Sequence, residues 1–364
     1  MQLAKFNLQN QQDFIRTLKD RVNSYFEETG KSRFGNTTLY WKTLIMLVLY
    51  ISPFVLILTG IVPFWANWIL YMVMGLGVAG IGMSVMHDAI HGSFSSNSIV
   101  NKIFRFSCEL LGANSFNWKV QHNFLHHTFT NIAGLDEDIS EKAILRLEPS
   151  GPWYKIHKFQ HIYALPLYSL LTLSWIVWGD YFSLARYDKK GIVKQIGGHT
   201  AKEVTIMIFS KAIYLFMHFV LPIFILGFVW WHVLIGFLLM HMVSGFILSV
   251  IFQLAHVVEG PEYPMPDSNG NLENNWAVHQ LHTTANFAKR RKLLSWFIGG
   301  LNYQIEHHLF PNISHIHYPK ISKIVENTAK EFKLPYYEFR TFRSAVMSHI
   351  RQLKLLGKDP KLAQ

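Results

Sequence analysis

The sequence predicts an all-α integral membrane protein, with four membrane-spanning helices in two hairpins and a helical cap on the cytoplasmic side. Half of the 364 residues are hydrophobic and only 16% are charged, whereas an average soluble domain has about 25% charged residues. Four stretches are apolar over roughly the 20 residues that a helix needs to cross a bilayer. Many of the 19 histidines lie beside the ends of these stretches, so we expect the cap to hold metal.

The expected spans form two pairs, each joined by a very short turn, so each pair is predicted to be a helical hairpin. The spans are residues 43–60, 64–86, 212–231 and 232–255. A fifth stretch, 161–180, contains Pro166 and has polar residues at both ends. We expect this stretch to lie in the membrane interface rather than to cross it.

The orientation follows from the positions of lysine and arginine, which favour the cytoplasmic side. Residues 1–42 contain seven of these residues, and the region after the fourth span contains more. Four spans place both regions on the cytoplasmic side. We therefore expect a cytoplasmic N-terminal segment (1–42) without a signal peptide, a membrane domain (43–345) and a polar C-terminal tail (346–364).

Cysteine content and charge narrow the possible functions. A single cysteine, Cys108, excludes a disulfide within the chain and a cysteine-based metal site. The net charge of +11 favours anionic lipid headgroups or an acidic protein as partners. No basic tract is interleaved with exposed aromatic residues, so no nucleic-acid partner is expected.

The histidines fall into clusters with spacings typical of ligands on helices. The clusters are "HDAIH" with His87 and His91, "HNFLHH" with His122, His126 and His127, "QIEHH" with Gln304, His307 and His308, and His256 directly after the fourth span. Residues four apart on a helix share a face, so the spacing predicts that His87 converges with His91 and His122 with His126. An adjacent residue is rotated by about 100°, so His127 is expected to point towards a second site.

The number of histidines indicates two metal ions. A catalytic zinc takes about three protein ligands, and eight clustered histidines exceed that number. The predicted orientation places all the clusters on one face of the membrane, where they can meet. Imidazole binds iron, zinc, copper or nickel, and iron is the choice for redox chemistry.

The same motifs resemble a known family. "HDAIH", "HNFLHHTFTN" and "QIEHHLFPNISHIHYP" resemble the three histidine boxes of the membrane fatty acid desaturases. The glutamine that opens the third box, together with "WAVHQLHTTANFA" (276–288) and "WFIGGLNYQIEHHLFP" (296–311), resembles the front-end subgroup of Δ6- and Δ5-type enzymes. The resemblance extends from about residue 80 to beyond residue 340.

The resemblance implies a non-haem di-iron enzyme that inserts a cis double bond into a fatty acyl chain, using O₂ and two external electrons. It implies these ligands: His87, His91, His122, His126, His127, His307 and His308, with His256 as a further one. Gln304 stands where other subgroups have histidine, and whether it binds metal is left open. Ligating histidines usually donate their second N–H to a carboxylate or carbonyl, which suggests as outer partners Asp88, Asp136, Asp138, Glu259 and Glu306.

The resemblance also implies partners. Many front-end relatives carry a fused cytochrome b5 domain with a His-Pro-Gly-Gly motif, which this sequence lacks. We therefore expect a separate electron carrier, either ferredoxin or free cytochrome b5, and a bacterial inner membrane as the location. The substrate is expected to be a fatty acyl lipid or an acyl-CoA, held among membrane lipids.

Other functions stay open at this point. A hydroxylase or conjugase could use the same di-iron scaffold. A zinc-dependent membrane hydrolase is a different class, although its usual His-Glu-x-x-His motif is absent. A metal transporter would place histidines along a pore, whereas most histidines here are expected at one face of the membrane. His218 and His241 lie inside expected spans, where polar residues are candidates for function.

Overall fold

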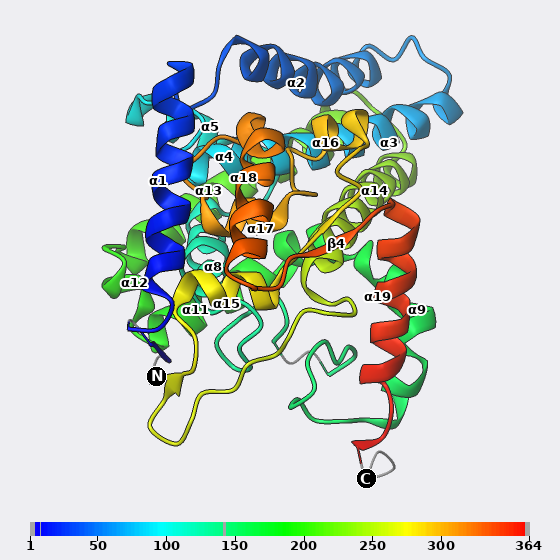
Figure 1. Ribbon diagram of the computed structural model, residues 1–364. Coiled ribbons are helices and arrows are strands. Elements are labelled where there is room, and N and C mark those ends of the chain that lie inside the picture. Colours follow the sequence, from blue (N-terminus) through cyan, green and yellow to red (C-terminus); the bar gives the residue numbers. More distant parts are fainter. Residues whose placement is uncertain (1–3, 8, 141–142, 361–364) are drawn as a thin grey trace. The chain divides into compact units, whose positions relative to one another are not determined.

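The computed structural model describes residues 4–7, 9–140 and 143–360. The chain forms two compact units, the first from Met1–Gly35, Gln121–Leu165 and Ile251–Gln364, the second from Asn36–Val120 and Pro166–Val250. Helices dominate both units, as the sequence predicts (Figure 1). Strands in the described part of the chain form two short parallel pairs, β1 (Lys5–Phe6) with β2 (Asn271–Leu272) and β3 (Ala285–Phe287) with β4 (Tyr337–Phe339).

The second unit contains most of the apolar helices. Its elements are α2 (Thr37–Leu58), α3 (Phe64–Ile81), η1 (Gly82–Met86), α4 (His87–Ile90), α5 (Ser98–Arg105), α6 (Ser107–Leu110), α7 (Ser115–Trp118), α10 (Leu171–Ser174), η4 (Trp175–Gly179), α11 (Asp180–Lys189), α12 (Ile192–Gln195), α13 (Thr200–Leu215) and η5 (Phe216–Ile225). Three helical segments continue along the chain from one unit into the other: η2 (Lys119–His126), α9 (Gln160–Tyr168) and α14 (Trp230–His256).

Four continuous helices in the described residues are long and apolar enough to cross a membrane, in agreement with the predicted number. They are Thr37–Leu58, Phe64–Ile90, Thr200–Ile225 and Trp230–His256. The third differs from the prediction, because it begins at Thr200 and ends at Ile225 rather than covering 212–231. Its first half looks polar in the sequence because it contains Lys202, Glu203 and Lys211. Gly227 has a φ of +73°, which allows the chain to turn before Trp230.

The expected interfacial stretch 161–180 is bent. Two helical segments, Lys155–Tyr168 and Leu171–Lys189, meet at an angle of 72°. Such a bend is compatible with a broken span or a re-entrant loop, and the interfacial location stays a prediction.

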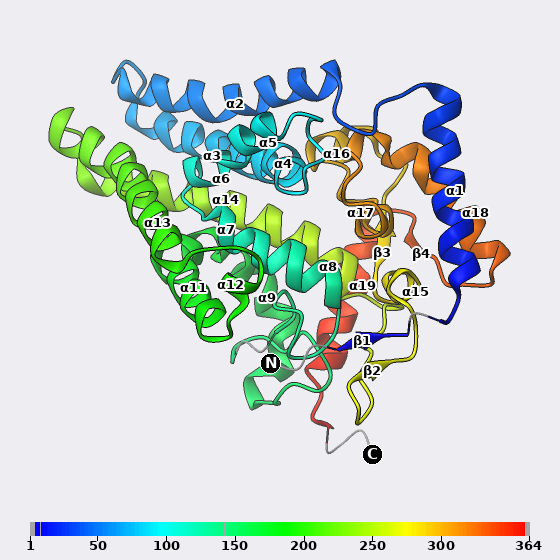
Figure 2. The same cartoon turned by 90° about the vertical axis from the view of Figure 1, so that its left-hand side faces the viewer.

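Close contact between α2 and α3 depends on glycine. The two helices run side by side in opposite directions (Figure 2). A Cβ atom at Gly77 would lie 2.8 Å from the backbone nitrogen of Tyr50. Small residues let the backbones of apolar helices approach closely, and here they hold the first hairpin together.

The first unit is built around an amphipathic helix. Its elements are β1, α1 (Gln12–Thr29), α8 (His127–Phe129), η3 (Lys155–Phe159), β2, α15 (Trp276–Thr283), β3, α16 (Lys292–Phe297), α17 (Gln304–Leu309), η6 (His315–His317), α18 (Tyr318–Glu331), β4 and α19 (Phe342–Leu356). Every fourth residue of α1 is buried, namely Phe14, Leu18, Val22 and Phe26. This face packs against α18 in a core that includes α15 and α17, so the histidines of α17 rest on a rigid support.

Candidate metal centre

The second histidine cluster lies on a widened helix. Residues Lys119–His126 form a π-helix that leads directly into α8. A π-helix bonds residue i to residue i+5, so residues five apart come together. The Nε2 atoms of His122 and His127 accordingly lie 3.2 Å apart. The predicted convergence of His122 with His126 is present, because one ligand atom of each lies within 4.8 Å of the other. The approach of His127 to His122 differs from the expectation that His127 would point towards a second site.

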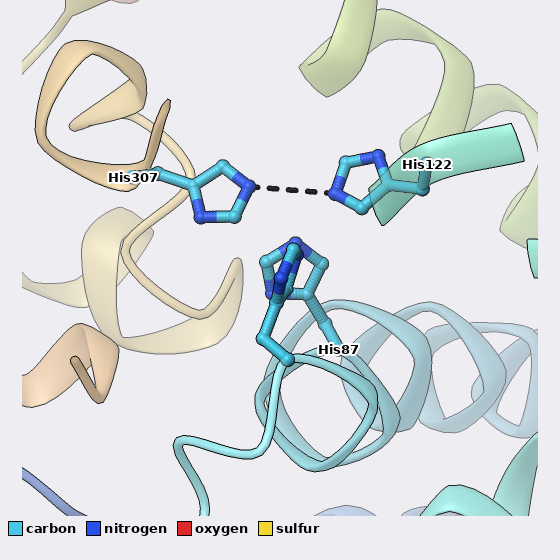
Figure 3. A group of neighbouring side chains, drawn as sticks. His87, His122 and His307 are labelled. Atoms are coloured by element: carbon cyan, nitrogen blue, oxygen red, sulfur yellow. Dashed lines mark hydrogen bonds between the residues drawn. The ribbon is translucent and has the colours of Figure 1, made fainter. Parts of the chain in front are cut away.

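His307 of α17 completes a group of three nitrogens. Its Nε2 lies 2.9 Å from that of His127 and 3.4 Å from that of His122. Figure 3 shows the rings of His122 and His307 facing each other, with a dashed line between their nitrogens. Ligands about 2.1 Å from one ion, at angles between octahedral and tetrahedral, lie about 3.0–3.4 Å apart. The three nitrogens therefore fit a single metal ion.

A second group of three histidines lies beside the first. His126, at the end of the π-helix, meets His256 at the end of α14 and His308 of α17, and one ligand atom from each lies within 4.8 Å of the others. All three side chains are buried. The adjacent pairs His126–His127 and His307–His308 thus each send one member to each group.

The outer nitrogens of the second group are held by oxygens. His126 Nδ1 contacts the Asp136 carboxylate at 3.0 Å, His256 Nδ1 contacts the Thr283 carbonyl at 3.2 Å, and His308 Nδ1 contacts Gln280 Oε1 at 2.9 Å. Among the described residues, Nε2 of His126 and of His256 is buried without a hydrogen-bond partner. An acceptor on Nδ1 and an unpartnered Nε2 are the arrangement of a metal-ligating imidazole, so the donor set fits a metal ion.

Asp136 is itself fixed in place. Its carboxylate accepts backbone N–H groups from Asn131 and Asp138 at 2.9 Å each. Asn131 adopts a left-handed conformation with a φ of +59°, and its side-chain amide donates to the carbonyl of His256 at 3.3 Å. Burial alone would lower the pKa of His126, but the carboxylates of Asp136 and Asp138 raise that pKa to about 9. A more basic imidazole is a stronger ligand.

The other predicted outer partners have varied surroundings. Asp138 lies 3.4 Å from His126 Nδ1, and Asp88 lies 3.9 Å from His87 Nδ1. Glu306 instead accepts hydrogen bonds from Tyr336 and Asn286, and Glu259 from Arg351 and Ser348. These two carboxylates therefore hold neighbouring segments rather than histidine rings.

Some hydrogen-bond partners of the histidines were not predicted from the sequence because they are not carboxylates. Gln280 and Thr130 both contact His308 Nδ1, and the Tyr318 hydroxyl contacts His307 Nδ1 at 3.2 Å. Gln280 lies within "WAVHQLHTTANFA", so that motif could have indicated it. Gln304 is buried at the start of α17, one turn before His307.

The first histidine box lies in the second unit. His87 lies in the last turn of the second apolar helix and His91 directly follows that helix, and their ring centroids are 4.7 Å apart. Their spacing predicted this convergence on one helix face.

The two histidines inside the spans bind neighbouring helices. His218 Nε2 lies 3.0 Å from the Tyr50 hydroxyl. His241 contacts the Tyr214 hydroxyl at 2.8 Å and Thr172 Oγ1 at 3.1 Å. Each histidine therefore has a hydrogen-bonding role in packing the apolar helices.

The comparison with known proteins identifies the family. The family model described as "Fatty acid desaturase" matches residues 63–340, a range that includes every histidine described above. The chain belongs to the fatty acid desaturase family. This desaturase is therefore an oxidoreductase of fatty acyl chains and an integral membrane protein, which sets aside the hydrolase and transporter alternatives.

The similarity to known desaturases extends over nearly the whole chain. The sn-1 linoleoyl-lipid 6-desaturase of Synechocystis sp. is 36% identical over 349 residues, which cover 95% of this chain and 96% of that protein. An enzyme of the same name from Arthrospira platensis is 32% identical, with 96% and 94% covered. The acyl-lipid (8-3)-desaturase of Physcomitrium patens is 35% identical over 95% of this chain and 72% of its own length.

Proposed function

We propose that this desaturase inserts a cis double bond into an acyl chain of a membrane lipid, using two histidine-bound iron ions. The reaction removes one hydrogen from each of two adjacent carbons. With O₂, two external electrons and two protons it yields the alkene and two molecules of water. The observation that supports this proposal most directly is the pair of three-histidine groups, His122–His127–His307 and His126–His256–His308.

Each histidine group would hold one iron. Bound iron supplies the O₂-dependent oxidation of an unactivated C–H bond, which no side-chain acid or base can perform. Asp136, Thr283 and Gln280 orient the rings of the second group, and Tyr318 orients His307. We include His87 and His91 as ligands on the resemblance of their motif to the first histidine box, and Gln304 as a buried candidate at the start of the third box.

An acyl lipid is the proposed substrate. The relatives from Synechocystis sp., Arthrospira platensis and Physcomitrium patens are named as enzymes of acyl chains in lipids. The second unit contains a small pocket lined by Val78, Gly82, Met86, Cys108, Leu111, Ala113, Trp118, Thr172, Trp175 and Leu248. These walls are almost entirely apolar, which suits a hydrocarbon chain.

The electrons are proposed to come from a separate ferredoxin or cytochrome b5. The chain carries a net charge of +11, and complementary charge favours encounters with an acidic carrier. The lysine and arginine distribution supports a cytoplasmic location for the metal centre, and we propose a bacterial inner membrane as the site of action.

Product analysis tests the reaction. The chain is expressed in a host whose lipids lack the product, and the lipids are analysed by mass spectrometry with double-bond localisation. We expect a product two hydrogens lighter than its precursor, and none from a His126→Ala variant present in the membrane in equal amount. An oxygen-containing product without loss of two hydrogens would instead indicate a hydroxylase.

A second assay tests the substrate class. The purified enzyme in lipid nanodiscs receives reductant, a carrier, and isotope-labelled linoleate either esterified in a glycerolipid or attached to CoA. We expect the label to be desaturated in the glycerolipid. Desaturation of the CoA ester alone would refute the acyl-lipid substrate while leaving the di-iron assignment intact.

A further inference from the structure

Five exposed cations follow the ends of the paired strands β3 and β4. The two strands pair in parallel, with Phe287 opposite Phe339, and the Ala288 amide donates to the Phe339 carbonyl at 2.8 Å. Parallel strands leave their pair in the same direction, so the segments that follow both strands start from one edge. The cations, called the basic patch below, are Arg290, Arg291, Lys292, Arg340 and Arg343.

The basic patch is not neutralised by the protein. Within the described residues, none of its five side chains has an ion-pair or hydrogen-bond partner. The neighbouring Lys289 differs, because it binds Glu338 at 2.8 Å and Glu326 at 3.3 Å. Glu338, two residues before Arg340, and Glu326 are thus already paired with Lys289, and the five charges are available to an anionic partner.

A large apolar side chain projects beside these charges. Leu293 directly follows Lys292 in α16, and it is 79% exposed. Leu294 and Trp296 of the same helix are only partly buried. An exposed leucine next to unpaired cations is a combination found in segments that insert into the boundary between lipid headgroups and acyl chains.

We propose that the basic patch and Leu293 form a docking site for an anionic phospholipid surface. The five cations bind lipid phosphates, and Leu293 enters the acyl boundary beneath them. Clusters of this size next to a membrane bind anionic lipids, and Trp296 is of the residue type that is enriched at that depth. An acidic protein would match the charges, but it gives no reason for the leucine to project.

The docking site is connected to the helix that carries His307 and His308. Just before the patch, Lys289 accepts a hydrogen bond from the Tyr303 hydroxyl at 2.8 Å through its carbonyl. Asn286 of β3 accepts the backbone N–H of Ile305 at 3.0 Å and donates to Glu306 at 2.9 Å. Docking would therefore hold α17 at a set height above the lipid headgroups. That consequence rests on the proposed acyl-lipid substrate, whereas the docking itself does not.

A single spin label measures the docking directly. Because Cys108 is the sole cysteine, a Cys108→Ser chain accepts one label at Leu293→Cys or, as a control, at Met265→Cys, which is 63% exposed in the same unit. The labelled full chain is placed in nanodiscs of phosphatidylcholine, alone or with about one third phosphatidylglycerol. Collision with a water-soluble nickel complex then reports how far each label is shielded from water.

In anionic nanodiscs, we expect the collision rate of the nickel complex with the label at position 293 to be lower than that with the label at 265 by a factor of about three or more. Replacing all five cations by glutamine should remove most of this difference. Equal accessibility at 293 and 265 in both lipid mixtures would overturn the proposal. Protection at 293 that requires an added acidic electron carrier would overturn it as well, and would assign the patch to a protein partner. None of these readouts depends on desaturase activity.

Discussion

The Nε2 atoms of His127 and His307 lie 2.9 Å apart, although the two residues are separated by 180 positions in the chain. His127 follows the π-helix and His307 belongs to α17. Neither segment could bind an ion through one imidazole, so the candidate metal centre forms only when the two segments are packed together. Loss of one histidine should therefore first remove the metal ion from the group of three to which that histidine belongs.

His127→Ala and His126→Ala test the division into two groups. Each variant removes one ligand from one group of three, so we expect each to retain about one of the two irons and to lose desaturation. His282→Ala is the matched control, because His282 is partly exposed and binds Glu262 rather than the centre. Iron per chain, measured by plasma mass spectrometry on purified protein, checks the prediction. Two retained irons in either variant would contradict the assignment.

Gln280 should matter for metal affinity without being a ligand. Its Oε1 accepts from His308 Nδ1, and loss of such an outer partner typically costs 10–100-fold in metal affinity or activity, so we expect about that loss for Gln280→Ala. Gln280→Glu keeps an acceptor oxygen and should lose less. Competition with a chelator of known affinity measures both variants, and an equal loss in both would indicate a packing role only.

The buried cation of α13 should be needed for stability. Lys211 is almost completely buried and binds Asp180 at 2.8 Å, together with the carbonyls of Gly112 and Trp175. Lys211→Met leaves the Asp180 charge without its partner, and we expect a loss of about 3–5 kcal/mol. Adding Asp180→Asn should restore part of this stability. Thermal unfolding in detergent compares the three chains, and a double variant less stable than Lys211→Met would contradict the ion-pair explanation.

Gly77 and Gly82 offer a matched pair of substitutions on the second apolar helix. A Cβ at Gly77 meets the Tyr50 backbone at 2.8 Å, whereas a Cβ at Gly82 meets only Leu248 Cδ2 at 3.6 Å. We expect Gly77→Ala to destabilise the protein by about 1–3 kcal/mol through overpacking, and Gly82→Ala to have little effect. Unfolding at increasing concentrations of a denaturing detergent tests whether Gly77→Ala is less stable than Gly82→Ala.

Metal exchange tests the chemistry rather than the ligands. Removing metal with a chelator under reducing conditions should abolish desaturation, and Fe²⁺ should restore it. Zn²⁺ also binds imidazole but has no redox chemistry, so refilling with zinc should give a loaded, inactive enzyme. Activity of the zinc form would refute the iron assignment. The assay measures formation of double bonds from isotope-labelled lipid.

The local pattern of apolar residues and histidines was sufficient to predict much of the structure of this protein. Apolar length predicted four spans, and the spacing of His87 and His91 predicted that their rings converge. Where the pattern misled, a specific physical cause was present. Lys202 and Lys211 made the start of the third span look polar in the sequence. The π-helix before His127 also brings His127 to His122, which α-helical spacing did not predict. Hydrogen bonding of a helix cannot be read from residue types alone.

The sequence by itself determined the fold class, the histidine boxes and, through them, the family, because hydrophobic length and motif spacing are properties of a continuous segment. Only the tertiary structure decided that His122, His127 and His307 form one group and His126, His256 and His308 another. It also showed that Gln280, Thr283 and Asp136 hold the outer nitrogens of the second group. These contacts join residues distant in the chain, and the packing of helices, rather than local spacing, sets which nitrogens meet.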